Sequence, residues 1–451
     1  MTAEAGVTGI CPERDGAETL DSAIDNRPLG TARIVSFVLS ALVMLVDGYD
    51  LAAMPLAVPH VVRAWGVEPG SFSVALSAVL AGLGVGAILL APLGDRLGRR
   101  PLLIGSTLLI ALATVGTSLA GSATDFAIWR FLTGVSLGAC LPNATALVAE
   151  LAPRRRRIGL LTVVSCGVSL GGVAAGFVVP PLTAAGGWTM IFVAPGLLTA
   201  VLALALFLLL PESPKLLLAR GKREALASLS ARLGLGDSSR WAQPSPPSNT
   251  PKASMFAPLA REYRFATFVF VGLYLLNALS LYLMVSWLPT ILPQAGFSLG
   301  QSARLTSLVQ GGGLVMGLLL SSLLDRGKTA PILAGAYVTV AAALLGFSVV
   351  PPTLAGWGLL LLVAGGGVSG VHLAMMAVGT SFYPPQMLSS AIGFAVAVAR
   401  VGAIAGPLLG GALIQNGFSP AAFLATVVVP VLACAAGVSL IPRVRRPGSK
   451  A

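Results

Sequence analysis

Twelve long apolar segments constrain this chain more than any other feature. Each is long enough to cross a bilayer, which takes ~20 residues of α-helix. Backbone groups in lipid must be hydrogen-bonded within the segment, so such segments predict helices. The predicted spans are residues 35–62, 72–93, 102–121, 125–149, 158–181, 189–210, 265–292, 302–324, 331–351, 355–381, 389–414 and 421–441. The expected fold class is all-α integral membrane.

The predicted spans fall into two sets of six, separated by one long polar segment. Many transporters are built from two such repeats, with the binding site at their interface. The long segment is basic, and its Pro- and Ser-rich run predicts a disordered linker. The expected organisation is a disordered cytoplasmic tail at 1–32, a six-helix domain at 33–210, a cytoplasmic linker loop at 211–264, a six-helix domain at 265–441 and a cytoplasmic tail at 442–451.

The distribution of charge sets the orientation. Charged residues make up 10% of the chain, compared with about 25% in soluble proteins. The net charge of +12 could suggest nucleic acid, but 25 of the 29 Lys and Arg residues fall on one side of the predicted membrane. This is the positive-inside pattern. It predicts both termini in the cytoplasm and a lipid bilayer, not nucleic acid, as the partner. Composition further favours a bacterial inner membrane, and we expect a functional monomer.

The first span contains two carboxylates, in the run Asp47-Gly48-Tyr49-Asp50. A charge near the bilayer centre costs roughly 2.5–3.5 kcal/mol on insertion scales, so intramembrane acids usually face a protein interior or a wet cavity. A spacing of three residues places both on one helix face, about 60° apart. The pattern predicts a proton and substrate site, and the alternative is a buried ion pair between helices. Which carboxyl carries the proton stays open, because two close acids can titrate as one unit.

Two cations lie within the spans, Arg130 and Arg400. A guanidinium stays charged when buried and matches a carboxylate with two parallel hydrogen bonds. Both are candidate substrate ligands, and a structural salt bridge is the alternative for each. Further candidates for substrate binding are polar or aromatic residues that could equally pack or pin helices. They are Tyr49, Asn143, Tyr274, Asn277, Tyr282, Trp287 and His372.

An Asp-Arg pair follows the second span and recurs after the eighth, as Asp95-Arg96 and Asp325-Arg326. An acid at the C-terminal end of a helix opposes the helix dipole and needs a partner. A contact of this kind can form in one conformation and break in another, so the repeat predicts a gate. Charge that only sets topology would explain Arg99 and Arg100, but not the repeated Asp.

Several motifs together carry a family resemblance. Residues 94–100 resemble the signature loop of the major facilitator superfamily, although Ala91 stands where a glycine is usual. Five further stretches complete the set. They are the tetrapeptide at 47–50, residues 130–138 with Pro142-Asn143 and Glu150, and residues 211–215, 287–290 and 402–407. Over nearly the whole chain, this set is similar to the aromatic acid:proton symporter family. The family's usual basic residue after the tenth span is missing.

The resemblance implies a twelve-helix major facilitator fold that imports benzoate-like or hydroxylated aromatic acids with protons by alternating access. It implies a gate that also includes Gly98, Glu150 and Glu212. It also implies that the first and fourth helices line one cavity, so we expect an Asp–Arg130 pair, with Arg400 as the substrate anchor. An inside-negative membrane potential opposes the entry of an acid anion by ~2.3 kcal/mol per charge per 100 mV. Transport of one proton together with the anion removes this penalty.

Two other functions remain open. A proton-driven drug or metabolite efflux antiporter would share the fold, and residues 402–411 carry a Gly-Pro pattern found in antiporters. A non-transporting membrane sensor would bind ligand without flux. An enzyme is not expected, because no nucleophile–base set is visible. With two histidines and four unpaired cysteines, no metal or other cofactor is expected either.

Overall fold

The computed structural model describes residues 19–237, 241, 257–324, 329–383 and 385–441, and all of their regular structure is helical. Up to the central segment the helices are α1 (Leu20–Asn26), α2 (Thr31–Trp65), η1 (Pro69–Phe72), α3 (Ser73–Leu89), α4 (Leu93–Leu97), α5 (Arg99–Thr117), α6 (Ala123–Leu151), α7 (Arg154–Gly186) and α8 (Met190–Leu209). They continue with α9 (Pro214–Ala219), α10 (Arg223–Leu233), η3 (Ala257–Leu259), α11 (Arg264–Ile291), η4 (Leu292–Ala295), α12 (Leu299–Leu324), α13 (Thr329–Gly346), α14 (Leu354–Phe382), α15 (Pro385–Gln415), α16 (Pro420–Thr426) and α17 (Val428–Val438).

Twelve helical segments of the described residues are long and apolar enough to cross a membrane. They coincide with the twelve predicted spans to within a few residues, and the tenth predicted span, 355–381, lies within α14. The predicted all-α fold class is confirmed. The apolar side chains that face outward, such as Leu198 and Val349, are those that a lipid environment would cover.

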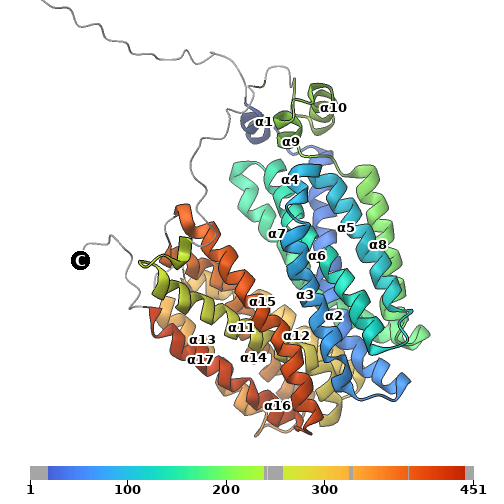
Figure 1. Ribbon diagram of the computed structural model, residues 1–451, viewed down its shortest axis with the longest axis vertical. Coiled ribbons are helices and arrows are strands. Elements are labelled where there is room, and N and C mark those ends of the chain that lie inside the picture. Colours follow the sequence, from blue (N-terminus) through green and yellow to red (C-terminus); the bar gives the residue numbers. More distant parts are fainter. Residues whose placement is uncertain (1–18, 238–240, 242–256, 325–328, 384, 442–451) are drawn as a thin grey trace, which may run out of the picture.

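The spans form two helix bundles (Figure 1). In the first bundle, α2–α8, α2 packs on α7, α3 on α6, and α5 on both α6 and α8. In the second bundle, α11–α17, α11 packs on α15, α12 on α14, and α13 on both α14 and α17. Small residues allow these close approaches, as is common between membrane helices. A Cβ at Gly48 of α2 would lie 1.8 Å from the carbonyl oxygen of Val168 in α7.

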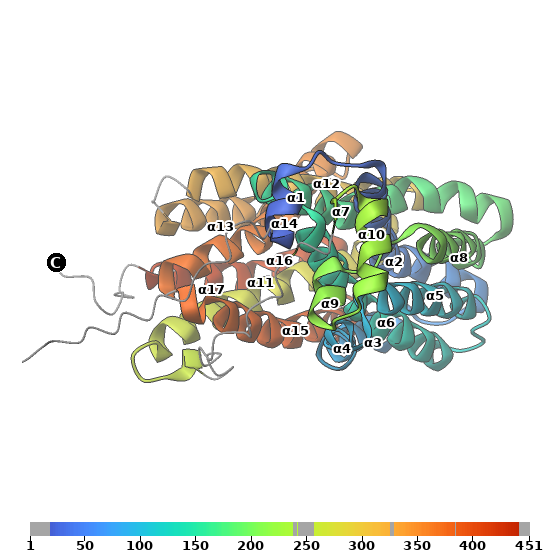
Figure 2. The ribbon, with the colours of Figure 1, turned by 90° about the horizontal axis from the view of Figure 1, so that it is seen from above.

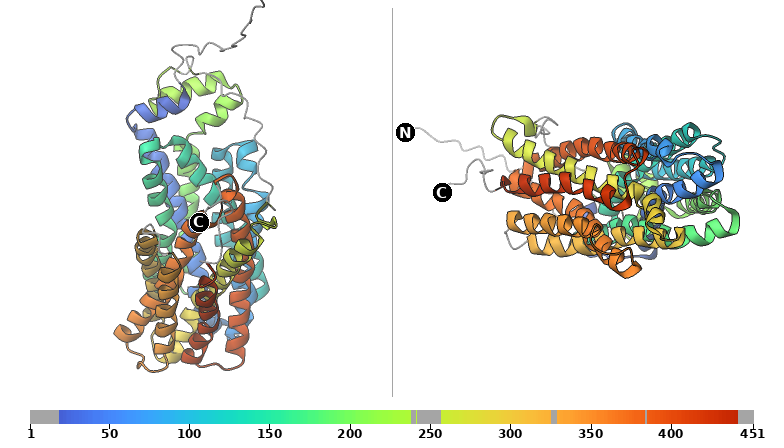
Figure 3. Two further views of the ribbon diagram at one scale, coloured as in Figure 1. Left: turned by 90° about the vertical axis from the view of Figure 1, so that its left-hand side faces the viewer. Right: turned by 90° about the horizontal axis from the view of Figure 1, so that it is seen from below.

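One end of the molecule carries α1, α4, α9 and α10, which Figure 2 shows from above. We call it the basic end, because the arginines at 96–100 and 154–157 lie there. The two bundles lie apart at the basic end and meet at the other (Figures 1 and 3). Ser77 donates to the carbonyl of Ile404 at 2.8 Å, and Ser307 to that of Val173 at 3.2 Å. These bonds join the bundles in the half of the molecule away from the basic end.

Part of the predicted N-terminal tail is helical, so the prediction of disorder is wrong for residues 20–26. Helix α1 begins at an N-cap, where the side chain of Thr19 accepts from the amide of Ser22. Leu20, Ala23 and Ile24 bury their side chains against the bundle. An ion pair of 2.7 Å between Asp21 and Lys215 adds a polar contact to α9. A short amphipathic turn with a cap and a docking surface folds, whereas its composition alone predicts a tail.

The predicted disordered linker is also partly helical, because α9 and α10 lie within its first half. Leu226, Leu229 and Leu233 form a buried stripe of α10 with the i, i+3, i+7 spacing of an amphipathic helix. Arg232 donates to the carbonyl of Leu209 at the end of α8 at 2.7 Å. The Pro- and Ser-rich part of the linker lies outside the described residues.

Candidate functional site

The structure brings Asp50 and Arg130 together, as the expected Asp–Arg130 pair requires. Asp50 is on α2 and Arg130 on α6, and their side chains form an ion pair. Arg130 also donates to Asp50 Oδ1 at 3.2 Å and to the Asp50 carbonyl at 3.1 Å. Thr114 of α5 donates to Asp50 Oδ1 at 2.9 Å. The pair therefore ties three helices of the first bundle together.

The Asp50–Arg130 pair lies in the interior of the first bundle, away from the second. Both residues are buried, and the guanidinium carbon of Arg130 lies 5.8 Å from the centre of the Phe192 ring. The neighbouring Tyr49 is also turned inward, and its hydroxyl donates to the carbonyl of Ile191 at 3.1 Å. In this conformation, neither Arg130 nor Tyr49 lines the cavity that lies between the two bundles.

Asp47 has a different environment from Asp50. It is 3% exposed, and its Oδ1 is buried without a hydrogen-bond partner among the described residues. It lies one helical turn before Leu51, which faces the space between the bundles, so both share one side of α2. A buried carboxyl that lacks a partner is costly in its ionised form. Of the two acids, Asp47 is the one whose carboxylate has no hydrogen-bond partner among the described residues.

Arg400 on α15 is half-buried and makes no hydrogen bond or ion pair with another described residue. Its guanidinium is close enough to interact electrostatically with Asp47 of the first bundle and with His372 of the second. Within the part of the chain that the structure describes, an acid of the first bundle and a cation of the second are thus without a hydrogen-bond or ion-pair partner. Such a pair of groups can receive an anion and a proton.

A cavity of about 160 Å³ opens between the bundles. Its floor and sides are largely apolar, with Leu51, Met54 and Leu80 from the first bundle and Leu281 from the second. Several polar side chains also line it, namely Ser169, Tyr282, Ser286, Gln310, Ser369 and His372. Larger hollows occur between α9 and α10 and along α12–α14, with volumes of about 310 and 330 Å³. Neither of these involves both bundles, so the interface cavity is the candidate ligand site.

A polar chain inside the second bundle ends at this cavity. The Tyr337 hydroxyl donates to Asn277 Oδ1 at 3.1 Å. The side-chain amide of Asn277 lies 3.3 Å from the Val368 carbonyl and 3.3 Å from His372 Nδ1. The Tyr274 ring stands edge-on to the His372 ring, with centroids 5.5 Å apart. Asn277 and Tyr274 thus support a cavity residue and do not line the cavity themselves.

Two other residues predicted to bind substrate lie elsewhere. Trp287 is fully buried and donates its indole N–H to the carbonyl of Pro407 at 2.9 Å, which links α11 to α15. Asn143 lies near the basic end, where it donates to the carbonyls of Ala91 and Ala139 at 3.1 and 2.8 Å. The bond from Asn143 to Ala91 joins α6 to the turn between α3 and α4. In this conformation neither side chain reaches the cavity.

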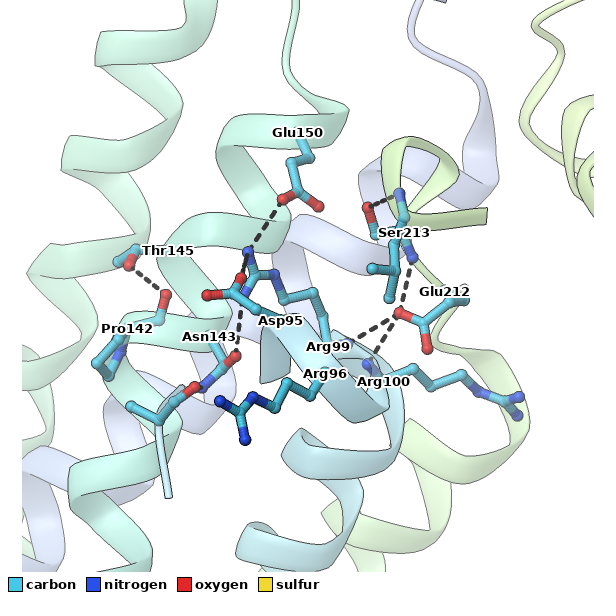
Figure 4. Close-up of polar contacts among 12 residues, drawn as sticks. Asp95, Arg96, Arg99, Arg100, Pro142, Asn143, Thr145, Glu150, Glu212 and Ser213 are labelled. Carbon is cyan, nitrogen blue, oxygen red and sulfur yellow. Dashed lines mark hydrogen bonds and ion pairs between the residues drawn. The ribbon is translucent and has the colours of Figure 1, made fainter. Parts of the chain in front are cut away.

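A charged cluster lies at the basic end of the first bundle (Figure 4). Arg99 is its centre, and its side chain contacts Asp95 at 2.5 Å, Glu150 at 3.4 Å and Asn143 Oδ1 at 3.3 Å. The acid at the helix end therefore has a neighbouring arginine as the partner that its position requires. This contact stays within the first bundle. The matching residues Asp325 and Arg326 lie outside the described part of the chain.

Glu212 caps the first turn of α5 from the end of the sixth span (Figure 4). Its Oε1 accepts from the backbone amides of Arg99 and Arg100 at 3.0 and 3.2 Å. A carboxylate at a helix N-terminus is favoured by the free amides and by the helix dipole. Gly98 makes this approach possible, because its φ is +129° and a Cβ there would lie 2.3 Å from Glu212 Oε2. The Arg96 carbonyl accepts a hydrogen bond from Arg220.

Sequence reasoning missed three residues that complete these groups. Thr114 binds Asp50, Tyr337 orients Asn277, and Gln310 lines the cavity. Threonines and tyrosines are common in membrane helices, so their type carries no signal. Gln310 is a polar residue inside a predicted span, and this could have marked it as a candidate.

The fold and the site define a polytopic, all-α membrane protein of two bundles with a binding cavity between them. A model of the Major Facilitator Superfamily matches residues 40–398. The chain is 31% identical to a gallate transporter of Pseudomonas putida, covering 94% of this chain and 95% of the relative. It is 32% identical to the 4-hydroxybenzoate transporter PcaK of Pseudomonas aeruginosa, covering 95% and 97%. The chain belongs to the major facilitator superfamily and, within it, to the aromatic acid:proton symporter family.

Solved structures agree on the fold. A bacterial homologue of the human lysosomal transporter Spinster, in an inward-facing, unoccupied conformation, superposes with a TM-score of 0.72 at 17% identity, covering 94% of this chain and all of that one. The xylose transporter XylE of E. coli, partially occluded and inward open, gives a TM-score of 0.70 at 17% identity, covering 94% of this chain and 100% of that chain. Since the matched family consists of transporters, the expectation that the chain is not an enzyme is confirmed.

Proposed function

We propose that this protein is a proton-coupled secondary transporter that imports an aromatic acid of the benzoate or hydroxybenzoate type. The names of its full-length relatives support this substrate class. In this proposal, the domains at 33–210 and 265–441 rock against each other around the cavity between them. The chain works as a monomer in a bacterial inner membrane, with both termini in the cytoplasm.

One observation carries the proposal: within the described residues, Arg400 and Asp47 have no hydrogen-bond partner, yet the Arg400 guanidinium of the second bundle is close enough to interact electrostatically with Asp47 of the first. Arg400 supplies the cation that an aromatic carboxylate needs. Asp47 supplies the carboxyl that can take up a proton without breaking a contact. Asp50 serves this purpose less well, because Arg130 and Thr114 already bind its carboxylate.

The two groups suggest how substrate and proton are coupled. When the acid anion binds Arg400, the attraction that favours the ionised form of Asp47 is weakened, and Asp47 takes up a proton. The loaded site then carries no added charge, which removes the ~2.3 kcal/mol per 100 mV that opposes entry of an anion. After release, Arg400 can attract Asp47, which gives up its proton on the inner side.

The cavity matches an aromatic ring in size and chemistry. An apolar protein cavity of about 150 Å³ can hold one benzene molecule, and the cavity here measures about 160 Å³. Leucine and methionine side chains suit the ring, while Gln310, Ser169 and Ser369 suit ring substituents that hydrogen-bond. None of these three side chains has a hydrogen-bond partner among the described residues.

The basic end is the cytoplasmic end in this proposal, as the charge distribution predicts. In this structure the two bundles are in contact at the end opposite the basic end and lie apart at the basic end. The structure then corresponds to an inward-facing state. Asp95, Arg96, Gly98, Arg99, Arg100, Glu150 and Glu212 would form the cytoplasmic gate of the first bundle, and Asp325 and Arg326 that of the second. In the present state Asp95 contacts Arg99 of its own bundle. Gate closure would require it, or a neighbour, to exchange this partner for one on the second bundle.

Uptake into proteoliposomes tests the proposal. Labelled benzoates, hydroxybenzoates and short aliphatic acids are supplied outside, with an inward proton gradient, to vesicles that contain wild type or Asp47→Asn. The expected result is gradient-driven accumulation of an aromatic acid by wild type and its loss in the variant. Exit of a preloaded compound against the proton flow would instead establish an antiporter. Saturable binding without flux in either direction would establish a sensor.

A further inference from the structure

Two contacts determine the orientation of the Asn277 side-chain amide. Its Oδ1 accepts from the Tyr337 hydroxyl at 3.1 Å, while its Nδ2 lies 3.3 Å from the Val368 carbonyl. A flipped amide would place Oδ1 against a carbonyl oxygen, where no hydrogen bond can form. The nitrogen of Asn277 therefore points to Val368. This also fixes which group of Asn277 faces His372.

The same nitrogen lies 3.3 Å from Nδ1 of His372. An amide NH₂ can only donate, so Nδ1 must accept and cannot carry a proton. A neutral imidazole has one proton, which must then sit on Nε2. The doubly protonated ring is excluded by the same contact, because it would place an N–H of His372 against an N–H of Asn277. The nearby Arg400 would also repel a second cation.

We propose that His372 is a neutral hydrogen-bond donor to the transported acid, and that Asn277 and Tyr337 are positioning residues that fix its tautomer. His372 lines the cavity, and its Nε2 has no partner among the described residues. The Nε2–H is thus available to an acceptor oxygen of a ligand in the cavity, and the Arg400 guanidinium is close enough to interact electrostatically with the same ring. The identity of the ligand rests on the proposed function, whereas the tautomer does not.

The tautomer can be observed directly by nitrogen NMR, because the chain has two histidines. Protein labelled with ¹⁵N in the imidazole rings is reconstituted in nanodiscs without substrate, and His60→Gln assigns the signals of His372. The expected spectrum has a protonated Nε2 and an unprotonated Nδ1. A protonated Nδ1, or a doubly protonated ring at the pH of transport, would overturn the proposal. This measurement needs neither a variant of His372 nor transport.

Two variants of the network test the positioning role. Tyr337→Phe removes the hydroxyl that holds Asn277, and Asn277→Ala removes the donor to Nδ1. Both are expected to give His372 signals from a mixture of tautomers. Tyr263→Phe, at a tyrosine of the same bundle that packs on Tyr383, is the matched control and should leave the signals unchanged. Wild-type signals in both network variants would exclude the positioning role.

Two substitutions of His372 separate its two nitrogens. Glutamine can place an N–H near the position of Nε2, whereas asparagine can replace only Nδ1 and so keeps the contact with Asn277. A hydrogen bond to a carboxylate contributes roughly 1.5–3 kcal/mol, which corresponds to about a ten- to hundredfold change in Kd. We therefore expect His372→Asn to weaken binding of labelled 4-hydroxybenzoate by about this factor, and His372→Gln by clearly less. The reverse order would show that His372 acts only through Asn277.

The outcomes separate this inference from the proposed function. If wild type binds none of the aromatic acids but has the Nε2–H tautomer, the proposed substrate class fails and the donor remains available to another ligand. If wild type transports an aromatic acid and His372→Asn binds it as tightly as wild type does, the donor role fails and the transport function stands. Thermal unfolding of each variant in detergent identifies any that is misfolded.

Discussion

Arg130 donates three hydrogen bonds to Asp50, two of them to the carboxylate and one to the backbone carbonyl. Neither residue reaches the cavity between the bundles. The contact is therefore typical of a structural salt bridge between α2 and α6, and not of a site for a transported ion. This gives the two acids of the first span separate roles and distinguishable mutant phenotypes.

Substitution of either residue of this salt bridge should destabilise the protein. Removing one member of a buried pair leaves an uncompensated charge or an unfilled donor set, which costs about 3–5 kcal/mol. We expect Asp50→Asn and Arg130→Gln each to lower the unfolding temperature in detergent strongly, and the double variant to regain part of the loss. Glu68→Gln, at an exposed acid, is the control. If both single variants were as stable as wild type, the salt bridge would have no structural role.

Asp47→Asn should uncouple transport from protons without unfolding the protein. Asp47 has no hydrogen-bond partner among the described residues, so a neutral amide of the same shape breaks no observed contact. We expect the variant to exchange labelled for unlabelled acid across the membrane but not to accumulate it under a proton gradient. Both assays are made on one batch of vesicles. Accumulation is the measurement, and exchange is the control that shows a folded, substrate-binding protein. Normal accumulation would move the proton site to another residue.

Arg400 should be needed for binding rather than for folding. Arg400→Gln removes a cation that has no partner among the described residues, so its unfolding temperature should stay near that of wild type while Kd for the acid rises at least tenfold. Arg400→Lys keeps the charge but loses the bidentate geometry, and an intermediate Kd is expected. Arg304→Gln, at an exposed arginine of α12, is the matched control. A large loss of stability with unchanged Kd would instead identify a salt bridge.

Sequence predicted the twelve spans well, because bilayer thickness and backbone hydrogen bonding restrict a long apolar segment to one structure. The Asp–Arg130 pair was expected from the family resemblance, which implies that the first and fourth helices line one cavity. Sequence could not tell Asp47 from Asp50. They differ in their hydrogen-bond partners on other helices: Asp50 has Thr114 and Arg130, whereas Asp47 has none among the described residues. Such partners are set by tertiary packing.

Polar residues in the spans were the least predictable part of the site. Asn143 and Asn277 have the same side chain and similar apolar surroundings in the sequence, yet one lies in the charged cluster and the other beside His372. The difference depends on the rotation of each helix about its axis. No intrinsic preference of a residue encodes this rotation, because packing against neighbouring helices determines it.

The contact between α1 and α9 should weaken in acid. The hydrogen bond from Lys215 holds the pKa of Asp21 below its ordinary value of 3.8. A carboxyl with a lowered pKa in the folded state stabilises that state above its ordinary pKa, and the effect is lost as pH falls through the lowered value. Hydrogen exchange of the α1 amides, corrected for intrinsic rate, should therefore show constant protection from pH 8 to 5 and less below about pH 4. In Lys215→Gln the acid-induced change should shrink, and because the pair is half exposed the effect should stay below about 1 kcal/mol.

The turn at Gly98 should be intolerant of a side chain. Its φ of +129° is strained for any residue with a Cβ, and that atom would also lie 2.3 Å from Glu212 Oε2. Gly98→Ala therefore costs roughly 1–3 kcal/mol of backbone strain and displaces the carboxylate that caps α5. We expect a slower transport rate with an unchanged Kd for the acid, because the cavity is not involved. Gly105→Ala, inside the helix α5 that follows Gly98 and with open space around it, should transport normally, and equal rates for the two variants would show that the turn plays no part in gating.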